Sequence, residues 1–185
     1  KDKNNAYQDI VLGFHDLAKY EAGSPYFGAI IGRYGNRIAD GKFDLKGETY
    51  ELVKNNGDNH LHGGSKGFDK VVWKAKQIIE KNLASIELRY LSKDMEEGYP
   101  GNLEVKVTYT LNNNDELTVH YEASTDKSMI INLTQHSYFN LSGDFKNDIL
   151  DHKIVIDADS FLPVNSKLIP TGELQDVLGT PFDFR

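Results

Sequence analysis

Apolar and polar residues alternate one by one along much of the chain. Between Leu103 and Leu111 the odd-numbered positions are apolar, and the even-numbered positions are Glu104, Lys106, Thr108 and Thr110. Because successive side chains of a β-strand point to opposite faces, this period is typical of a strand with one buried face. The alternation returns between Leu117 and Ala123, after the turn-forming segment 112–115. The two segments therefore predict an antiparallel hairpin.

Similar patterns predict further strands elsewhere in the chain. They cover residues 8–14, 42–45, 49–53, 72–79, 85–91 and 153–156, and the second and third are joined across Lys46, Gly47 and Glu48. No segment has a convincing helical period. The turn-rich connections contain no domain boundary, low-complexity run or internal repeat. We therefore expect residues 1–185 to form a single all-β unit, either a sandwich or a barrel.

The composition fits a folded protein and narrows the choice of partners. Of the 185 residues, 39% are hydrophobic and 11% are aromatic, which argues against intrinsic disorder. The formal net charge of −7 argues against nucleic acid and anionic membranes as partners, since both require clustered positive charge. The chain has no cysteine, which excludes disulfides and thiolate chemistry, and no apolar run approaches the length of a membrane span.

Three stretches concentrate the side chains that could do chemistry. The segment 132–141 places His136 among polar and aromatic neighbours, and an imidazole can exchange a proton near neutral pH. A lone histidine in such a place is more often a hydrogen-bonded structural residue. The segments 32–38 and 55–70 add arginines, histidines and amides between turn-forming glycines, and the segment 94–103 adds paired acids beside an aromatic ring.

Loops on a rigid scaffold often carry functional residues, so these stretches could converge on one pocket. Amide, guanidinium and carboxylate groups beside aromatic rings suit a polyhydroxylated ligand. A sugar offers hydroxyl groups for hydrogen bonds and C–H faces for stacking.

The same stretches resemble the galactose mutarotase (aldose 1-epimerase) family. The matching motifs, in the family's order, are Gly-Arg-x-x-Asn-Arg-Ile at Gly32–Ile38, Leu-His-Gly-Gly at Leu61–Gly64, Gly-Phe-Asp-Lys at Gly67–Lys70, Glu-Glu-Gly-Tyr-Pro-Gly at Glu96–Gly101 and the histidine signature at Asn132–Leu141. The likeness runs through nearly the whole chain from Asp9 onward. It implies a large twisted antiparallel β-sandwich, incomplete in this chain, which would be part of a longer mutarotase-like domain with sugar bound in a cleft on one sheet.

The resemblance also implies residue roles in interconverting the α and β anomers of an aldohexose, galactose or glucose. His136 would be the acid that protonates the ring oxygen, and His62 would bind the ring or anomeric oxygen as a second catalytic group. Asn36 and Arg37 would bind sugar hydroxyls, whereas Arg33 would brace the loop. The expected partner is the sugar alone, without cofactor or metal. The expected compartment is the cytoplasm, with the periplasm as the alternative.

The chain departs from the family pattern in two respects. Gln135 stands where the family signature has asparagine, so an amide on a longer arm could change how His136 is held. The family's catalytic glutamate and a sugar-binding aspartate come from a region after the position of Arg185, and its first strands precede Lys1. We therefore expect a fragment that has little activity alone. Catalytic groups that act as a unit lose most of their effect when one of them is removed.

Two other functions stay open at this point. A non-catalytic carbohydrate-binding domain could share the fold. A metal-dependent enzyme could use His60, His62 and His136, since a His-x-His pair on a strand points to one side. The following Gly63 and Gly64 argue for a loop instead, and no further ligand stands at metal-binding spacing, so no metal site is expected.

The remaining histidines and the paired acids are expected outside the site. His120 lies on the polar phase of its strand, and His15 and His152 lie near strand ends without a constellation around them. Glu96 and Glu97 are adjacent on a turn, whereas the carboxylates of a glycosidase pair stand roughly 5 to 9 Å apart on either side of a substrate. We expect both acids to belong to the turn or to the rim of the site.

Overall fold

The computed structural model describes residue 4 and residues 6–185 of the protein. The chain divides into two compact units. The central unit is Ala29–His136, and the terminal unit combines the described part of Lys1–Gly28 with Ser137–Arg185. The organisation of residues 1–185 as a single unit stays a prediction. The described residues contain no helix with the length and apolar character that crossing a membrane requires.

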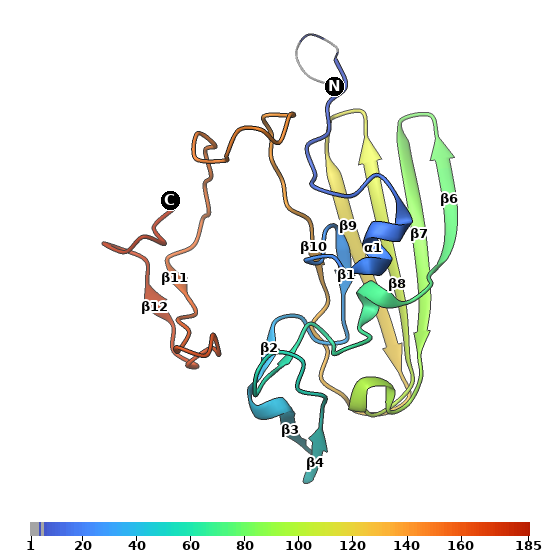
Figure 1. Ribbon diagram of the computed structural model, residues 1–185, viewed down its shortest axis with the longest axis vertical. Helices are drawn as coiled ribbons and strands as arrows, with labels where there is room; N and C mark the ends of the chain where they lie inside the picture. Colours follow the sequence, from blue (N-terminus) through green and yellow to red (C-terminus); the bar gives the residue numbers. More distant parts are fainter. Residues whose placement is uncertain (1–3, 5) are drawn as a thin grey trace. The chain divides into compact units, whose positions relative to one another are not determined.

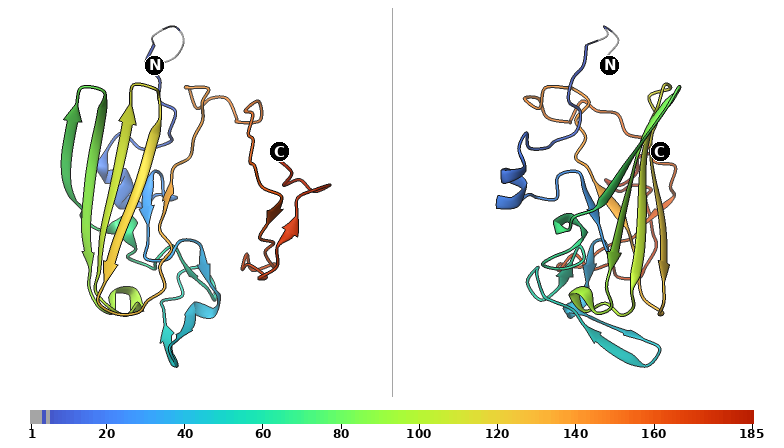
Figure 2. Two further views of the ribbon diagram at one scale, coloured as in Figure 1. Left: turned by 180° about the vertical axis from the view of Figure 1, so that it is seen from behind. Right: turned by 90° about the vertical axis from the view of Figure 1, so that its right-hand side faces the viewer.

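A four-stranded antiparallel sheet forms the main body of the central unit (Figure 1). Its strands follow one another in chain order as β6 (Lys74–Glu80), β7 (Leu83–Ser92), β8 (Leu103–Asn112) and β9 (Leu117–Thr125). β8 and β9 form the predicted hairpin, with Leu111 opposite Leu117. In its turn, the Asn112 side-chain oxygen accepts hydrogen bonds from the backbone N–H groups of Asn114 (2.9 Å) and Glu116 (3.2 Å). Figure 2 shows this sheet nearly edge-on, with its strands twisted relative to one another.

One face of the sheet carries the main hydrophobic core. Leu103, Val105 and Val107 of β8 are at most 1% exposed and pack with Ile30 and Phe68. Burying each of these aliphatic side chains contributes about 1.5–3 kcal/mol. The alternate residues of β7, β8 and β9 form a charged outer face, on which exposed ion pairs such as Arg89 with Glu87 contribute little. Burial therefore confirms the predicted period from Leu103 to Val107, whereas Leu111 at the far end of β8 is 53% exposed.

Shorter strand pairs and turns complete the central unit. They are β1 (Ala29–Ile31) with β10 (Thr134–His136), β2 (Arg37–Ile38) with β5 (His60–Leu61), β3 (Lys42–Leu45) with β4 (Glu48–Glu51), and the 3-10 turns η1 (Ala39–Gly41), η2 (Phe68–Lys70) and η3 (Glu96–Gly98). The β3–β4 hairpin was predicted and is confirmed. Its turn residues Lys46 and Gly47 have the left-handed φ angles 53° and 86°. A second small core contains Ile38, Leu52 and Tyr99.

The terminal unit has little regular structure. It contains the helix α1 (Leu17–Ala22) and the strand pair β11 (Ser160–Phe161) with β12 (Gln175–Asp176). Asp16 caps α1 by accepting a hydrogen bond from the backbone N–H of Lys19 at 3.1 Å. The sequence pattern did not predict this helix. A six-residue helix is too short to show a 3.6-residue hydrophobic period.

Two predicted strands of the terminal unit are not formed in the described residues. Residues 8–14 pair at one bridge, between Val11 and Phe139. Residues 153–156 contain no strand, and Ile154 and Val155 are 60% and 79% exposed. An apolar pattern makes a strand only where a neighbouring strand supplies hydrogen-bond partners. The period along one segment does not reveal whether that neighbour is present.

The Arg33 guanidinium is a buried polar group on which a long turn of the central unit depends. Arg33 is 2% exposed. Its Nε donates to the hydroxyl oxygen of Ser92 at 2.8 Å, and its Nη2 donates to the carbonyl oxygen of Lys93 at 2.6 Å. Its Nη1 donates to the carbonyl oxygens of Pro100 (3.1 Å) and Gly101 (2.9 Å). Arg33 therefore braces a loop, as the sequence predicted.

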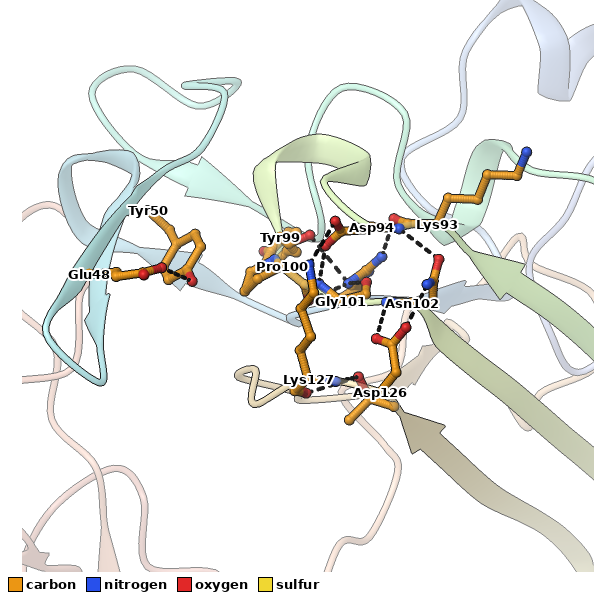
Figure 3. A network of polar contacts seen from close by, with 12 residues as sticks. Glu48, Tyr50, Lys93, Asp94, Tyr99, Pro100, Gly101, Asn102, Asp126 and Lys127 are labelled. Carbon is orange, nitrogen blue, oxygen red and sulfur yellow. Dashed lines mark hydrogen bonds and ion pairs between the residues drawn. The ribbon is translucent and has the colours of Figure 1, made fainter.

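The other side of the same turn is held by surface side chains (Figure 3). Asp94 accepts hydrogen bonds from the Gly101 backbone N–H and, at 2.9 Å, from the Lys127 ammonium group. Asn102 donates to the Asp126 carboxylate from its backbone N–H at 2.7 Å and from its side-chain amide at 2.6 Å. These contacts lower the pKa of both carboxyl groups, that of Asp94 chiefly through Lys127 and that of Asp126 chiefly through Asn102.

Replacing the buried guanidinium should destabilise this turn and the central unit that contains it. Burial lowers the pKa of Arg33 and the nearby Glu96 opposes that shift, but an arginine stays charged in a folded protein. Arg33→Lys leaves buried carbonyl oxygens without donors, so we expect a loss of about 2–4 kcal/mol in the free energy of unfolding. Urea unfolding monitored by circular dichroism measures it. The control Arg89→Lys, on the charged outer face, should lose less than about 0.5 kcal/mol, and equal losses would contradict the bracing role.

Candidate active site

The pairing of short strands brings the predicted site residues of the central unit together. Asn36 directly precedes β2, which Arg37 begins, and His62 directly follows β5, the partner of β2. His136 ends β10. The ring centroids of His62 and His136 lie 5.2 Å apart, with an interplanar angle of 88°. The residues that the sequence singled out for catalysis and for binding are therefore neighbours in the structure.

A tight turn fixes the position of His62. The φ angles of His62, Gly63 and Gly64 are 52°, 87° and 108°, all in the region that favours glycine. A Cβ atom on Gly63 would lie 1.7 Å from the carbonyl oxygen of Gly32, so no other residue fits there without moving the backbone. The Leu-His-Gly-Gly sequence thus determines the direction in which the His62 side chain points from the backbone.

A backbone hydrogen bond sets the tautomer of His62. The backbone N–H of Asn36 donates to Nδ1 of His62 at 3.0 Å, and the N–H of His62 donates to the carbonyl oxygen of Asn36 at 3.0 Å. Since Nδ1 is an acceptor, the proton of the neutral ring is on Nε2. Burial, followed by the positive charges of His136 and Arg37, lowers the pKa of His62 to about 4, and Asp69 partly opposes them. His62 is therefore a neutral hydrogen-bond donor at physiological pH.

Arg37 presents a guanidinium group held in one orientation. Its Nε donates to the side-chain oxygen of Asn56 at 2.9 Å, and its Nη1 donates to the side-chain oxygen of Asn36 at 3.3 Å. Asn56 is itself fixed by reciprocal backbone hydrogen bonds with Asn59, both 3.1 Å long. The half-buried Arg37 and the exposed Asn36 are thus prearranged to offer donors and an amide to a polar ligand.

The β1–β10 pairing fixes the backbone of His136. His136 lies opposite Ala29, and Gln135 lies opposite Ile30. Because side chains alternate along a strand, Gln135 and His136 point to opposite sides. The prediction that the amide of Gln135 changes how His136 is held stays a prediction.

The structure separates His60 from the other two site histidines. His60 is fully buried, at 0% exposure. Its Nδ1 lies 2.8 Å from the carbonyl oxygen of Val53 and must donate to it, so its Nε2 accepts the hydrogen bond from the Tyr99 hydroxyl, also at 2.8 Å. The metal site of His60, His62 and His136 is therefore wrong, because both ring nitrogens of His60 are already used. Among the described residues, no group of three or more His, Cys, Asp or Glu side chains could hold a metal ion.

Of the other titratable residues, His120 lies on the strand where the sequence predicted it, whereas the strands expected beside His15 and His152 are not formed. His120 is exposed on β9, beside Glu122, and His15 is exposed as well. His152, in the terminal unit, accepts a hydrogen bond from the Leu141 backbone N–H at 2.7 Å. Glu96 accepts hydrogen bonds from the hydroxyls of Tyr90 (2.9 Å) and Ser92 (2.8 Å), which makes it a turn acid.

Sequence reasoning missed three residues around the site. Asn56 orients Arg37, although it was visible only as one amide in a turn-rich stretch. Asp69 has a buried carboxylate oxygen without a hydrogen-bond partner among the described residues, and its charge acts on His62. Glu97 accepts hydrogen bonds from the backbone N–H groups of Ser65 and Lys66, just after the His62 turn. The spacing of these residues in the chain gives no sign of these contacts.

Comparison with solved structures identifies the class of fold. The chain matches an aldose epimerase homologue from C. elegans with a TM-score of 0.90 and 32% sequence identity, over 100% of this chain and 55% of that one. It matches galactose 1-epimerase from Lactobacillus acidophilus with a TM-score of 0.82 and 29% identity, over 96% of this chain and 52% of that one. The prediction of an all-β, galactose mutarotase-like fold is confirmed.

Sequence comparison then identifies the family. The aldose 1-epimerase family model matches residues 1–185, and the chain belongs to that family. Galactose mutarotase from Sus scrofa is 51% identical over 100% of this chain and 53% of its own length. Aldose 1-epimerase from Escherichia coli (strain K12) is 40% identical over 98% of this chain and 51% of its own length. The chain spans about half the length of these curated relatives.

The lowered pKa of His62 predicts how the stability of the protein depends on pH. His62 should titrate near pH 4 in the folded protein and at about 6.5 when unfolded. Between these values the unfolded state binds more protons, so the contribution of His62 to stability is complete above about pH 6.5 and is lost as the pH falls toward 4. NMR titration of the ring protons measures the pKa, and His62→Gln assigns the signal and should flatten the pH dependence. A His62 pKa at the ordinary value would contradict the buried, Asn36-bonded ring.

Proposed function

We propose that the protein acts as an aldose 1-epimerase, which interconverts the α and β anomers of an aldohexose such as galactose or glucose. The observation that carries the proposal is the pair of imidazoles His62 and His136, 5.2 Å apart, in a chain that belongs to the aldose 1-epimerase family. Arg37 and Asn36 adjoin them through hydrogen bonds. This set of groups suits a small, uncharged ligand with several hydroxyl groups.

The reaction requires the sugar ring to open and close again on the other face of C1. A base removes the proton of the C1 hydroxyl while an acid protonates the ring oxygen, so that the bond from C1 to the ring oxygen breaks and a carbonyl forms at C1. Rotation about the C1–C2 bond turns this carbonyl before the ring closes. Each positioned proton transfer contributes roughly 10²- to 10⁴-fold in rate.

The two histidines take different parts in this reaction. His62 is neutral because of its lowered pKa, and its Nε2–H donates a hydrogen bond to the ring or anomeric oxygen, where negative charge develops. His136 is the acid that gives its proton to the ring oxygen. Arg37 and Asn36 bind the sugar hydroxyls through the guanidinium fork and the amide.

The proposal assigns no residue of this chain as the base. Glu96 and Glu97 are adjacent acids in the central unit, but both carboxylates are occupied. Glu96 accepts hydrogen bonds from two hydroxyls, and Glu97 accepts two from backbone N–H groups. The family resemblance implies that the base is a different glutamate, from the region after the position of Arg185. The proposed mechanism needs no cofactor, and the cytoplasm stays the expected compartment, with the periplasm as the alternative.

Removing the proposed acid should abolish most of the catalysis. In a full-length protein that includes the family's glutamate, His136→Ala deletes the proton donor to the ring oxygen, so we expect the rate of anomerisation to fall by about 10² or more. Polarimetry with freshly dissolved α-galactose measures it. The control His120→Ala changes an exposed histidine on β9 and should leave the rate as it is. A His136→Ala rate within about threefold of the original would remove His136 from the mechanism, since general acid catalysis is worth far more. Sugar binding without any acceleration by the unmutated full-length protein would favour the carbohydrate-binding alternative.

Removing the proposed binding guanidinium should weaken the affinity for sugar. Arg37→Ala deletes charge-assisted hydrogen bonds, each worth about 1.5–3 kcal/mol, so the dissociation constant for galactose should rise by at least tenfold. Calorimetric titration gives this constant directly. Arg89→Ala, which removes an arginine from the outer face of β7, is the matched control and should bind galactose normally. Equal losses in both variants would show that Arg37 has no special place in the site.

A further inference from the structure

We propose that Glu97 is a positioning residue, whose carboxylate holds the 61–66 loop in place and thereby keeps His62 aimed into the active site. The inference rests on the proposed function of His62. It adds a residue to that function which contacts neither the sugar nor the reacting atoms.

The contact itself uses both carboxylate oxygens of Glu97. Oε2 accepts the backbone N–H of Ser65 at 2.9 Å, and Oε1 accepts the backbone N–H of Lys66 at 3.0 Å. Hydrogen bonds to an ionised carboxylate are about twice as strong as those between neutral groups. The approach is close, because a Cβ atom on Gly64 would lie 2.1 Å from Oε2. Glycine at this position, with φ of 108°, lets the loop and the carboxylate meet.

The loop carries this contact directly to His62. The N–H of Gly64 donates to the carbonyl oxygen of Leu61 at 3.0 Å, which closes a turn around His62 and Gly63. On its other side, His62 exchanges hydrogen bonds with Asn36, through its backbone N–H and its Nδ1. His62 therefore lies between two fixed points. Releasing the Glu97 side would remove one of these two points and leave the loop free to shift relative to Asn36.

The backbone around Glu97 is itself restrained. Its own φ is 51°, a left-handed value, and a Cβ atom on the following Gly98 would lie 2.5 Å from the carbonyl oxygen of Glu51. The turn that contains Glu97 is bound by the buried Arg33 guanidinium through the carbonyl oxygens of Lys93, Pro100 and Gly101. A rigid anchor of this kind can transmit its position to a catalytic group.

The charge of Glu97 is not among the causes that set the pKa of His62. Those causes are burial, His136, Arg37 and Asp69. A variant of Glu97 should therefore alter the titration of His62 only by moving the ring, by exposing it and by weakening its bond to Asn36. This makes the titration of His62 a readout that loss of stability elsewhere would not change.

The test compares Glu97→Gln, Glu97→Asp and Glu96→Gln in the full-length protein, where kcat can be measured. Gln keeps the length but turns one acceptor into a donor, and Asp keeps the charge but is too short to reach both N–H groups. We expect the His62 pKa, followed by NMR, to move in both Glu97 variants toward the ordinary value of about 6.5. We also expect kcat for galactose to fall by about tenfold or more with a smaller change in KM, because a displaced catalytic group mainly loses transition-state stabilisation. Glu96→Gln should lose stability but keep the His62 titration.

Several outcomes would overturn the proposal. One is a folded Glu97→Gln variant with an unchanged His62 titration, and another is a Glu96→Gln variant that shifts the titration equally. If the Glu97 variants do not fold, amide hydrogen exchange in the unmutated protein still tests the contact. The Ser65 and Lys66 amides should exchange at least tenfold more slowly than unprotected amides, and the absence of this protection would overturn the proposal. Failure of the epimerase function alone looks different, since His136→Ala would then be harmless while the His62 titration still responded to Glu97.

Discussion

The buried guanidinium of Arg33 is the interaction on which the central unit depends. A turn as long as 93–101 has backbone carbonyl groups that no strand can satisfy, and burying them unpaired would cost several kcal/mol. Arginine solves this problem because its planar fork offers donors in several directions and stays charged at any physiological pH. At 2% exposure, Arg33 reaches a hydroxyl and three carbonyl oxygens of Lys93, Pro100 and Gly101 within 3.1 Å. The turn that joins the end of β7 to the start of β8 thereby keeps one defined geometry.

This constraint explains how irregular backbone can support a site. The candidate residues stand on short strands and tight turns, where few ladder hydrogen bonds restrain them. Their restraint comes instead from single polar contacts to more rigid parts. Arg37 is held through Asn56, and His62 is held through Asn36. The turn that Arg33 organises also presents Glu97 to the His62 loop. The position of His62 thus depends on the 93–101 turn, and that turn depends on the buried charge of Arg33.

The sequence predicted those parts that leave a pattern in side chains. The β8 and β9 hairpin was visible because one face is buried and the period is two. Helix α1 was missed because its six residues are fewer than two helical turns. Arg33 and Arg37 stand in similar sequence surroundings. Only the family resemblance indicated that Arg33 would brace a loop and that Arg37 would bind the sugar. The contact of Glu97 could not be predicted, because its partners are backbone N–H groups, which every residue except proline carries.

The surroundings of His62 also bear on the proposed mechanism. His62 and His136, with ring centroids 5.2 Å apart, repel each other when both are protonated, which adds to the burial that lowers the pKa of His62. The Asn36 N–H points at Nδ1 of His62 and opposes protonation there. In the proposed mechanism, His62 keeps an Nε2–H that can stabilise a developing oxyanion. One backbone hydrogen bond, 3.0 Å long, therefore decides which ring nitrogen of neutral His62 carries the proton that the proposed mechanism uses.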